Sequence, residues 1–383
     1  MKSKITSNYF KTLLKQQIPT LIFNTVIFSL TYTIPLILQI IDNMGIYEEK
    51  PTINEYTHFY HLSTQTGFII FALAMYALAV PIYSLTYLTK KKQIDTYYSL
   101  PISRTKIAIL HILCGAIYVL IPFTAVFITG SLITLCAYPE VQYGYYLLEY
   151  LLLVVMFVLY LMFNTFFYTR ANRISDGIFT MIFANFVLVL IEWSNNTLFD
   201  YYIFDGDLIL ALIPFWGFIE YGNFFDKLIT AKYDYKDYVT SEMRYGGFGK
   251  TMPNEQWYSK IMPFEEWYGK IGDTSYLYFI VLLIVGVLAI VLFIILHKKR
   301  KPELAEENSR SKFGLEILTP IIYTCLTILL CSNGDVIARL VIFSGIALFY
   351  LATTVLELRS FKIPLYKILI LIGMSTLIFI SGR

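Results

Sequence analysis

A nucleotide-binding loop is the first chemistry to test, because residues 244–251 read RYGGFGKT. A phosphate-binding loop needs Gly-x-x-x-x-Gly-Lys-[Ser/Thr] between a strand and a helix, so that its backbone N–H groups surround the phosphates. Gly249, Lys250 and Thr251 fit this pattern, but Arg244 stands where the first glycine should be. The stretch therefore does not predict an ATP site, and any ATP hydrolysis must be done by another chain.

Metal-binding and catalytic groupings are equally sparse. His58 and His61 lie three residues apart near Glu55 and could in principle hold a metal ion. In a tyrosine-rich polar loop, solvated side chains are the simpler interpretation. The four cysteines show no Cys-x-x-Cys spacing, so neither a zinc site nor a disulfide framework is indicated. We expect no metal, no cofactor and no enzymatic activity in this chain.

A duplicated decapeptide stands in a polar stretch, where MPNEQWYSKI (252–261) is followed directly by MPFEEWYGKI (262–271). Met-Pro at the start of each copy disfavours one unbroken helix. Each copy should therefore form a short turn that presents a Trp-Tyr pair, the two pairs being Trp257 with Tyr258 and Trp267 with Tyr268. Two interpretations stay open: packing on the outer surface of a membrane, or a docking surface for a substrate or partner subunit.

Long apolar blocks determine the fold class. The chain has 383 residues, of which 57% are hydrophobic and 15% charged. A run of about 20 apolar residues crosses a hydrocarbon core about 30 Å thick as a helix. Nine blocks have this character, although the seventh and ninth are short: 18–41, 67–88, 107–135, 145–167, 177–193, 276–296, 315–330, 336–356 and 365–380. We therefore predict an all-α polytopic membrane protein.

Basic residues in the connecting loops predict the orientation. With a cytoplasmic N-terminus, the inner side carries 20 of the 30 Lys and Arg residues and only 7 of the 27 Asp and Glu residues. Cytoplasmic loops are enriched in Lys and Arg, so this orientation is favoured. Residues 1–17 mix four lysines with apolar residues at helical spacing and predict an interfacial amphipathic helix on the inner leaflet, a frayed basic tail being the alternative.

Few polar residues lie inside the apolar blocks. Glu149 and Glu192 fall near block ends, where a long side chain can reach water. Asn164 and Asn185 are placed mid-block and should hydrogen-bond between helices. Because no carboxylate is predicted deep in the membrane, the sequence favours motion driven by an ATPase partner over an ion-driven carrier.

The segment between the fifth and sixth blocks should lie outside. Its part from 207 to 222, DLILALIPFWGFIEYG, is too short to cross and is interrupted by Pro214, which predicts a re-entrant or interfacial pair of helices. Phe215, Trp216 and Phe218 suit the headgroup level. Residues 223–275, which include the duplication, should form a small extracellular loop domain.

The inner loop between the second and third blocks reads KKKQIDTYYSLPISRTKI (90–107). Pro101 should end any helix that runs through it, and Ser103 can cap the next helix. Tyr97, Tyr98 and Leu100 offer apolar anchors to a partner, while Asp95 and Arg104 offer charges. An ordinary basic inner loop is the competing interpretation.

This loop resembles the corresponding segment of ABC-2-type transporter permeases of Gram-positive bacteria, of the Ytr-like acetoin or peptide-antibiotic transporter kind. The motif is YYSLPISRTKI (97–107), and weaker similarities occur in HKKRKPELAEENSRSKFGLEILTPI (297–321) and FSGIALFYLATTVLELRSFKI (343–363). The chain departs from the family pattern at ELAEEN, which lacks the glycine expected after the alanine, and in the long aromatic loop before the sixth block.

The resemblance implies an architecture and partners. It implies a six-span permease core (18–296), a cytoplasmic linker (297–313) and extra C-terminal spans (314–383). Residues 90–106 would be the coupling segment that docks on separate ABC ATPase subunits, which supply ATP and magnesium. Re-entrant helices would close the outer mouth, and the permease would pair with itself or with a related permease in the lipid bilayer. No nucleic acid partner is expected.

The leading functional hypothesis is therefore a permease subunit of an ATP-driven exporter in the bacterial plasma membrane. It would move or remove an amphipathic substrate such as a peptide or peptide antibiotic. The alternative is a membrane sensor or scaffold subunit whose extracellular loop binds a ligand without transport.

Overall fold

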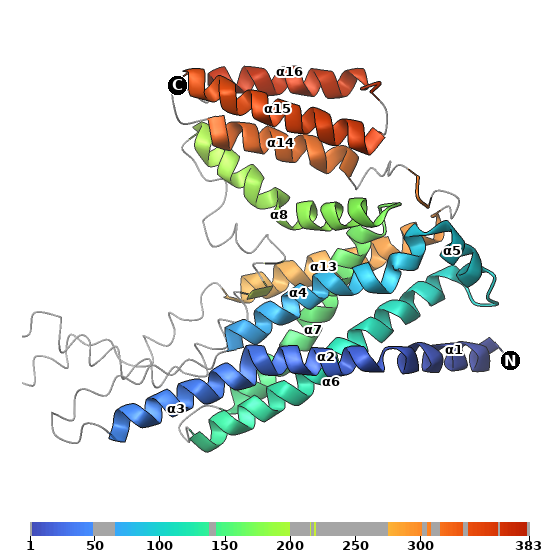
Figure 1. Ribbon diagram of the computed structural model, residues 1–383, viewed down its shortest axis with the longest axis vertical. Coiled ribbons are helices and arrows are strands. Elements are labelled where there is room, and N and C mark those ends of the chain that lie inside the picture. Colours follow the sequence, from blue (N-terminus) through green and yellow to red (C-terminus); the bar gives the residue numbers. More distant parts are fainter. Residues whose placement is uncertain are drawn as a thin grey trace, which may run out of the picture.

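The computed structural model describes residues 2–48, 66–137, 143–199, 215, 218–219, 275–300, 305–307, 315–331, 336–358 and 361–380 (Figure 1). These residues are helical or lie in short turns between helices, with no strand among them. The helices of the first half are α1 (Lys2–Gln16), α2 (Ile18–Phe28), α3 (Ile34–Glu48), α4 (Thr66–Leu85), α5 (Lys91–Tyr98), α6 (Arg104–Ala137), α7 (Tyr143–Tyr168) and α8 (Ile174–Phe199). The later ones are α13 (Ser275–Lys298), α14 (Leu315–Cys331), α15 (Val336–Leu358) and α16 (Leu365–Ile380).

All nine apolar blocks form helices, which confirms the all-α prediction. Six stretches of the described chain are long and apolar enough to cross a membrane: 18–41, 66–89, 104–137, 146–168, 279–298 and 337–355. Shorter apolar stretches lie in α8 (174–187), α14 (316–331) and α16 (365–376).

Two groups of helices build the molecule. We call α2–α4, α6, α7 and α13 the body; their facing side chains form one large buried cluster rich in aromatic rings. We call α14, α15 and α16 the C-terminal layer; they lie side by side beyond α8, which connects the two groups (Figure 1). Lipid tails are as apolar as leucine, so van der Waals packing and polar contacts between helices, rather than removal from water, hold such a bundle together.

The first span contains a π-helical turn, Ser29–Thr33, that joins α2 to α3. Tyr32 in this turn is fully buried and stacks on Phe127 of α6 with ring centroids 5.9 Å apart. Gly130, one turn further along α6, faces the same ring, and a Cβ atom there would overlap it. The wide turn and the glycine together let the first span approach α6 closely.

The N-terminal helix α1 forms as predicted, but its apolar face has a protein partner. Tyr9, Phe10, Leu13 and Leu14 pack against Leu110, Cys114 and Tyr118 of α6. Lys11 and Lys15 are exposed on the other side. The apolar stripe that the sequence assigned to the lipid surface is therefore largely covered by α6, and an interfacial position of the basic face stays a prediction.

Buried amides link α7 to α8, as expected for the two mid-block asparagines. The Tyr160 hydroxyl donates to Asn185 Oδ1 at 2.9 Å, and Asn185 Nδ2 donates to Asn164 Oδ1 at 2.9 Å. All three side chains are at most 2% exposed. Unpaired polar groups are costly in an apolar bundle, so these bonds fix how the two helices face each other.

The expectation that Glu149 reaches water near a helix end is wrong. Its side chain is 0% exposed. The reason is helical periodicity: Glu149 shares a face of α7 with Tyr146, Leu153, Phe157 and Tyr160, and these residues point into the body. The face on which a residue falls, rather than its distance from the helix end, decides its exposure.

Candidate functional site

The candidate site is the end of the body at which α5 lies, called here the α5 end. α5 is a short helix between the 3-10 turn Thr86–Thr89 that ends the second span and the start of α6. Lys90 has extended backbone angles, φ −117° and ψ 115°, which separate α5 from the preceding turn. α5 ends at Tyr98, and Pro101 follows three residues later, as the sequence predicted.

Ser99 closes the C-terminus of α5 with local hydrogen bonds. Its backbone N–H donates to the Asp95 carbonyl at 3.1 Å, and its Oγ donates to the Thr96 carbonyl at 2.8 Å. These bonds satisfy carbonyl groups that the helix itself leaves free. The segment is thus a defined helix with a closed end.

The two faces of α5 differ. Ile94 is 2% exposed, and Tyr97, Tyr98 and Leu100 are partly buried against the core of the body. The predicted apolar anchors therefore hold α5 to its own chain instead of standing free for a partner. The exposed residues of the predicted coupling set are Asp95, Pro101, Ser103 and Arg104.

Arg104 is also oriented by the chain, because its guanidinium carbon lies 4.7 Å from the ring centroid of Tyr98. This distance is within the range of a cation–π interaction. Tyr98 thus supports the charged group while its own ring packs inward. The outward surface of α5 is polar and charged, with both signs present.

An aromatic cluster connects α5 to α1. The His111 ring of α6 lies 4.8 Å from the Tyr87 ring and 5.3 Å from the Tyr97 ring, and Tyr87 and Tyr97 are 4.8 Å apart. The Tyr9 hydroxyl of α1 is 2.8 Å from His111 Nε2. His111 therefore brings together rings from four segments, its own helix α6 included, and this cluster fixes α5 against α6 and α1.

Arg300, two residues after α13, joins the ends of three helices. Its Nη1 donates to the Thr169 carbonyl at 2.8 Å, and its Nη2 donates to the carbonyls of Leu88 and Ala171 at 3.1 and 2.9 Å. These carbonyls follow the C-termini of α4 and α7. The C-terminus of a helix carries partial negative charge, so a guanidinium there is stabilised by both hydrogen bonds and the helix dipoles.

Positive charge is concentrated at the α5 end. Burial lowers the pKa of Arg300, and the tyrosines at 98, 87 and 168 oppose this shift. Burial, together with the charge of Arg300, lowers the pKa of Arg170 to about 10. Arg170 therefore stays charged at neutral pH. The Arg170 guanidinium lies 5.4 Å from the Phe166 ring centroid, which offsets part of its desolvation.

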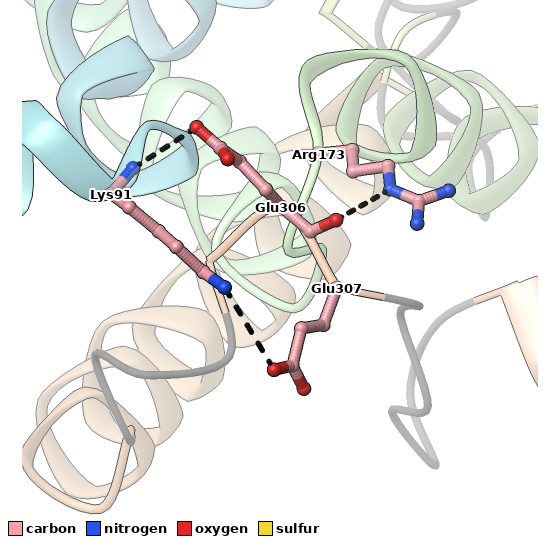
Figure 2. Close-up of polar contacts among 4 residues, drawn as sticks. All are labelled: Lys91, Arg173, Glu306 and Glu307. Carbon is pink, nitrogen blue, oxygen red and sulfur yellow. Dashed lines mark hydrogen bonds and ion pairs between the residues drawn. The ribbon is translucent and has the colours of Figure 1, made fainter.

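Residues 305–307 of the segment after α13 touch both α5 and the turn between α7 and α8 (Figure 2). Glu306 Oε1 accepts a hydrogen bond from the Lys91 backbone N–H at 3.2 Å, and the Glu306 carbonyl accepts one from Arg173 Nε at 3.1 Å. The Glu306 backbone N–H donates to the Asn172 carbonyl at 3.0 Å. Ala305 beside it is 2% exposed.

Sequence reasoning missed Arg300 and Glu306. Arg300 belongs to the basic run 297–301, which was attributed to the positive-inside bias as a whole. Glu306 belongs to ELAEEN, the stretch that departed from the family pattern. That departure was the available signal, since Glu306 occupies the position after Ala305 at which the family pattern has a glycine.

Three residues of the predicted re-entrant segment are described, Phe215, Phe218 and Ile219, and the two aromatic ones pack against the bundle. Phe218 is 0% exposed and stacks on Tyr160 of α7 at 5.8 Å. The Phe215 ring lies 6.2 Å from Phe71 of α4 and 6.3 Å from Phe186 of α8. Phe218 is therefore a core residue that packs on the protein itself, and its level in the membrane stays a prediction. The rings fill space between α4, α7 and α8.

The remaining predicted sites lie outside the described residues. They are Pro214 and Trp216 of the re-entrant segment, the decapeptide residues Trp257, Tyr258, Trp267 and Tyr268, the 244–251 stretch and the histidines at 58 and 61. In the part of the chain that the structure describes, there is no group of three or more His, Cys, Asp or Glu residues that could hold a metal ion.

Comparisons with known proteins add no relative: no protein-family model, no curated protein and no solved structure matches this chain. The functional argument therefore depends on the geometry of the α5 end.

Proposed function

We propose that this chain is the membrane-spanning permease subunit of an ATP-driven exporter and that α5 is its contact with a separate ATPase subunit. The observation that carries the proposal is the construction of α5: a short helix at one end of the body, fixed on its apolar face and exposed on its charged face. A helix of this kind is suited to receive a force from another protein and pass it to the spans.

Rigid attachment of α5 supports the proposal. Tyr87 and Tyr97 connect α5 to the end of the second span and to α6 through His111. Arg300 connects the end of that same span to α7 and to the segment after α13. Motion of α5 would therefore displace the ends of α4, α6, α7 and α13 together. An ordinary inner loop, whose basic residues only set the orientation in the membrane, does not require such attachments.

The proposed substrate is an amphipathic molecule such as a peptide or peptide antibiotic. Aromatic side chains from α4, α7 and α8 surround Phe215 and Phe218, so a segment before α13 reaches into the bundle. Rearrangement of this segment would open a route on the side opposite α5.

The N-terminus would be cytoplasmic in a bacterial plasma membrane, and two permease chains would act with two ATPases.

The test reverses one exposed charge on α5 and one at the start of α6, beside α5, and asks whether ATPase activity is lost. An affinity-tagged chain is purified from its native membrane, and ATP hydrolysis by the purified material is measured. The paired change Asp95→Arg with Arg104→Glu should leave the amount of chain in the membrane unchanged. Charge reversal at a close docking pair costs a few kcal/mol, so the ATPase subunit and the hydrolysis should be lost together.

Lys15→Glu on α1 is the matched control, because it reverses a charge of similar exposure away from α5. It should retain the ATPase. If the wild-type chain purifies with no ATP hydrolysis, or if the α5 variant hydrolyses ATP as the wild type does, the proposal is wrong. A chain that purifies with a histidine kinase instead would favour the sensor interpretation.

A further inference from the structure

Glu306 is the point at which three separate parts of the chain meet (Figure 2). Its side chain contacts the first residue of α5, and both of its backbone polar groups contact the turn between α7 and α8. The residue itself belongs to the segment that connects α13 to the C-terminal layer.

The backbone of Glu306 has a costly conformation. Its φ is 66°, and among the residues that the structure describes no other non-glycine residue has a positive φ. The left-handed region is unfavourable for residues other than glycine. Such a conformation persists where surrounding contacts determine it, and it often marks a functional position. Glycine would remove the strain but would supply no carboxylate.

The carboxylate meets a specific need of α5. The first backbone N–H groups of a helix have no partner within the helix, and the N-terminus carries partial positive charge. The residue preceding α5, Lys90, provides no side-chain cap. Glu306 accepts the Lys91 N–H from outside the helix and so replaces the missing cap. The start of α5 thereby depends on a segment more than two hundred residues later.

We infer that Glu306 is a positioning residue and that residues 305–307 are the second half of the docking element. The inference rests on the proposed function of α5. The linker holds α5 and the α7–α8 turn in one unit, so a force on α5 reaches α7 and α8 directly as well as α4 and α6. Because residues 305–307 precede α14 in the chain, the hydrogen bond between Glu306 and Lys91 also connects the C-terminal layer to the docking helix.

Hydrogen exchange on the full chain in lipid nanodiscs tests the positioning role without any partner. In Glu306→Ala, the backbone amides of residues 91–94 should exchange about tenfold faster than in the wild type, because the cap is lost. Glu306→Gln keeps an oxygen acceptor and should restore most of the protection. Amides in the middle of α6 and α7 should not change in either variant.

Glu307→Ala is the control with the same chemistry one residue away. Glu307 Oε1 lies 4.0 Å from Lys91 Nζ, and both side chains are about half exposed, so its removal should leave exchange in α5 unchanged. Equal exchange in Glu306→Ala and the wild type would overturn the inference. So would an equal increase in Glu307→Ala, since the effect would then reflect lost negative charge and no specific cap.

A second measurement separates this inference from the proposed function. ATP hydrolysis by the purified wild-type complex tests the proposed function. Hydrogen exchange in α5 tests the contact between Glu306 and α5. Where the wild type has ATPase activity, Glu306→Ala should keep the ATPase bound while losing substrate-stimulated hydrolysis, and Glu306→Gln should recover it. If Glu306→Ala exchanges faster in α5 but its substrate-stimulated ATP hydrolysis is unchanged, the contact between Glu306 and α5 does not transmit force. The positioning role would then be rejected.

Discussion

The body and the C-terminal layer are both bundles of apolar helices, but their contacts differ in kind. In the body, buried polar groups join separate helices: Asn24 donates to the Tyr118 carbonyl at 2.8 Å and accepts from the Tyr76 hydroxyl at 2.8 Å. A second network, of Tyr160, Asn164 and Asn185, joins α7 of the body to α8. In the C-terminal layer the bonds between helices are longer, such as the Tyr350 hydroxyl to the Lys367 carbonyl at 3.5 Å, and others, such as Thr327 Oγ1 to the Tyr323 carbonyl, lie within one helix.

Glycine use separates the two groups in the same way. A Cβ atom on Gly130 or Gly286 of the body would collide with Tyr32 or with Leu159. Nothing lies within 4 Å of the corresponding position on Gly345 or Gly373 of the layer. Apolar side chains alone do not distinguish one helix partner from another in lipid. Close approach and buried polar bonds therefore fix the body in one arrangement and leave the layer less constrained.

Among the substitutions compared, Arg300→Ala should have the largest effect on the free energy of unfolding. It removes charged hydrogen bonds to three carbonyls, each worth about 1.5–3 kcal/mol, and leaves those carbonyls without their partner. We expect a loss of about 3 kcal/mol or more in the free energy of unfolding, measured by titrating SDS into detergent micelles. Lys298→Ala removes an exposed neighbouring charge and serves as the control. Similar unfolding of the two variants would mean that the junction contributes little.

Two alanine substitutions at glycine compare the groups directly. Gly130→Ala in the body should lower the free energy of unfolding by about 1–3 kcal/mol, because Tyr32 must move away from a well-packed site. Gly345→Ala in α15 should be neutral or should stabilise by up to about 1 kcal/mol, since alanine is the better helix former. Equal destabilisation by both would show that the layer is as tightly packed as the body.

Asn185→Ala should have the smallest effect of the three. It removes the bonds from α8 to Tyr160 and Asn164 on α7, and hydrogen bonds between membrane helices average below about 1 kcal/mol. Ser375→Ala on α16, whose hydroxyl bonds only within its own helix, provides the baseline for the layer. A loss above about 2 kcal/mol for Asn185→Ala would indicate that the network is stronger than such bonds usually are.

The sequence predicted the helices well because one strong constraint decides them. Every backbone polar group in lipid must be satisfied within the helix, so an apolar block of sufficient length is a helix. The short α5 was also predictable, since Pro101 limits it. The asparagines at 164 and 185 were correctly assigned to contacts between helices, because they had no other partner in an apolar block.

The direction of individual side chains was harder to predict. Tyr97, Tyr98 and Leu100 were assigned to a partner but face the chain's own core, and Glu149 was assigned to water but is buried. Periodicity identifies an apolar face without saying what covers it. Glu306 contacts Lys91 across more than two hundred residues, and no local pattern in a single sequence encodes such a contact.

The length of α6 has a geometric consequence for α5. α6 has 34 residues and is thus about 51 Å long at 1.5 Å per residue. Its exposed apolar side chains extend from Ile109 to Leu135, a distance of about 39 Å along the helix axis. To keep that stretch within a hydrocarbon core about 30 Å thick, the helix must lean about 40° from the bilayer normal. The two ends of that stretch are then displaced sideways by about 25 Å, so that α5, which precedes α6, does not lie beneath the far end of that helix.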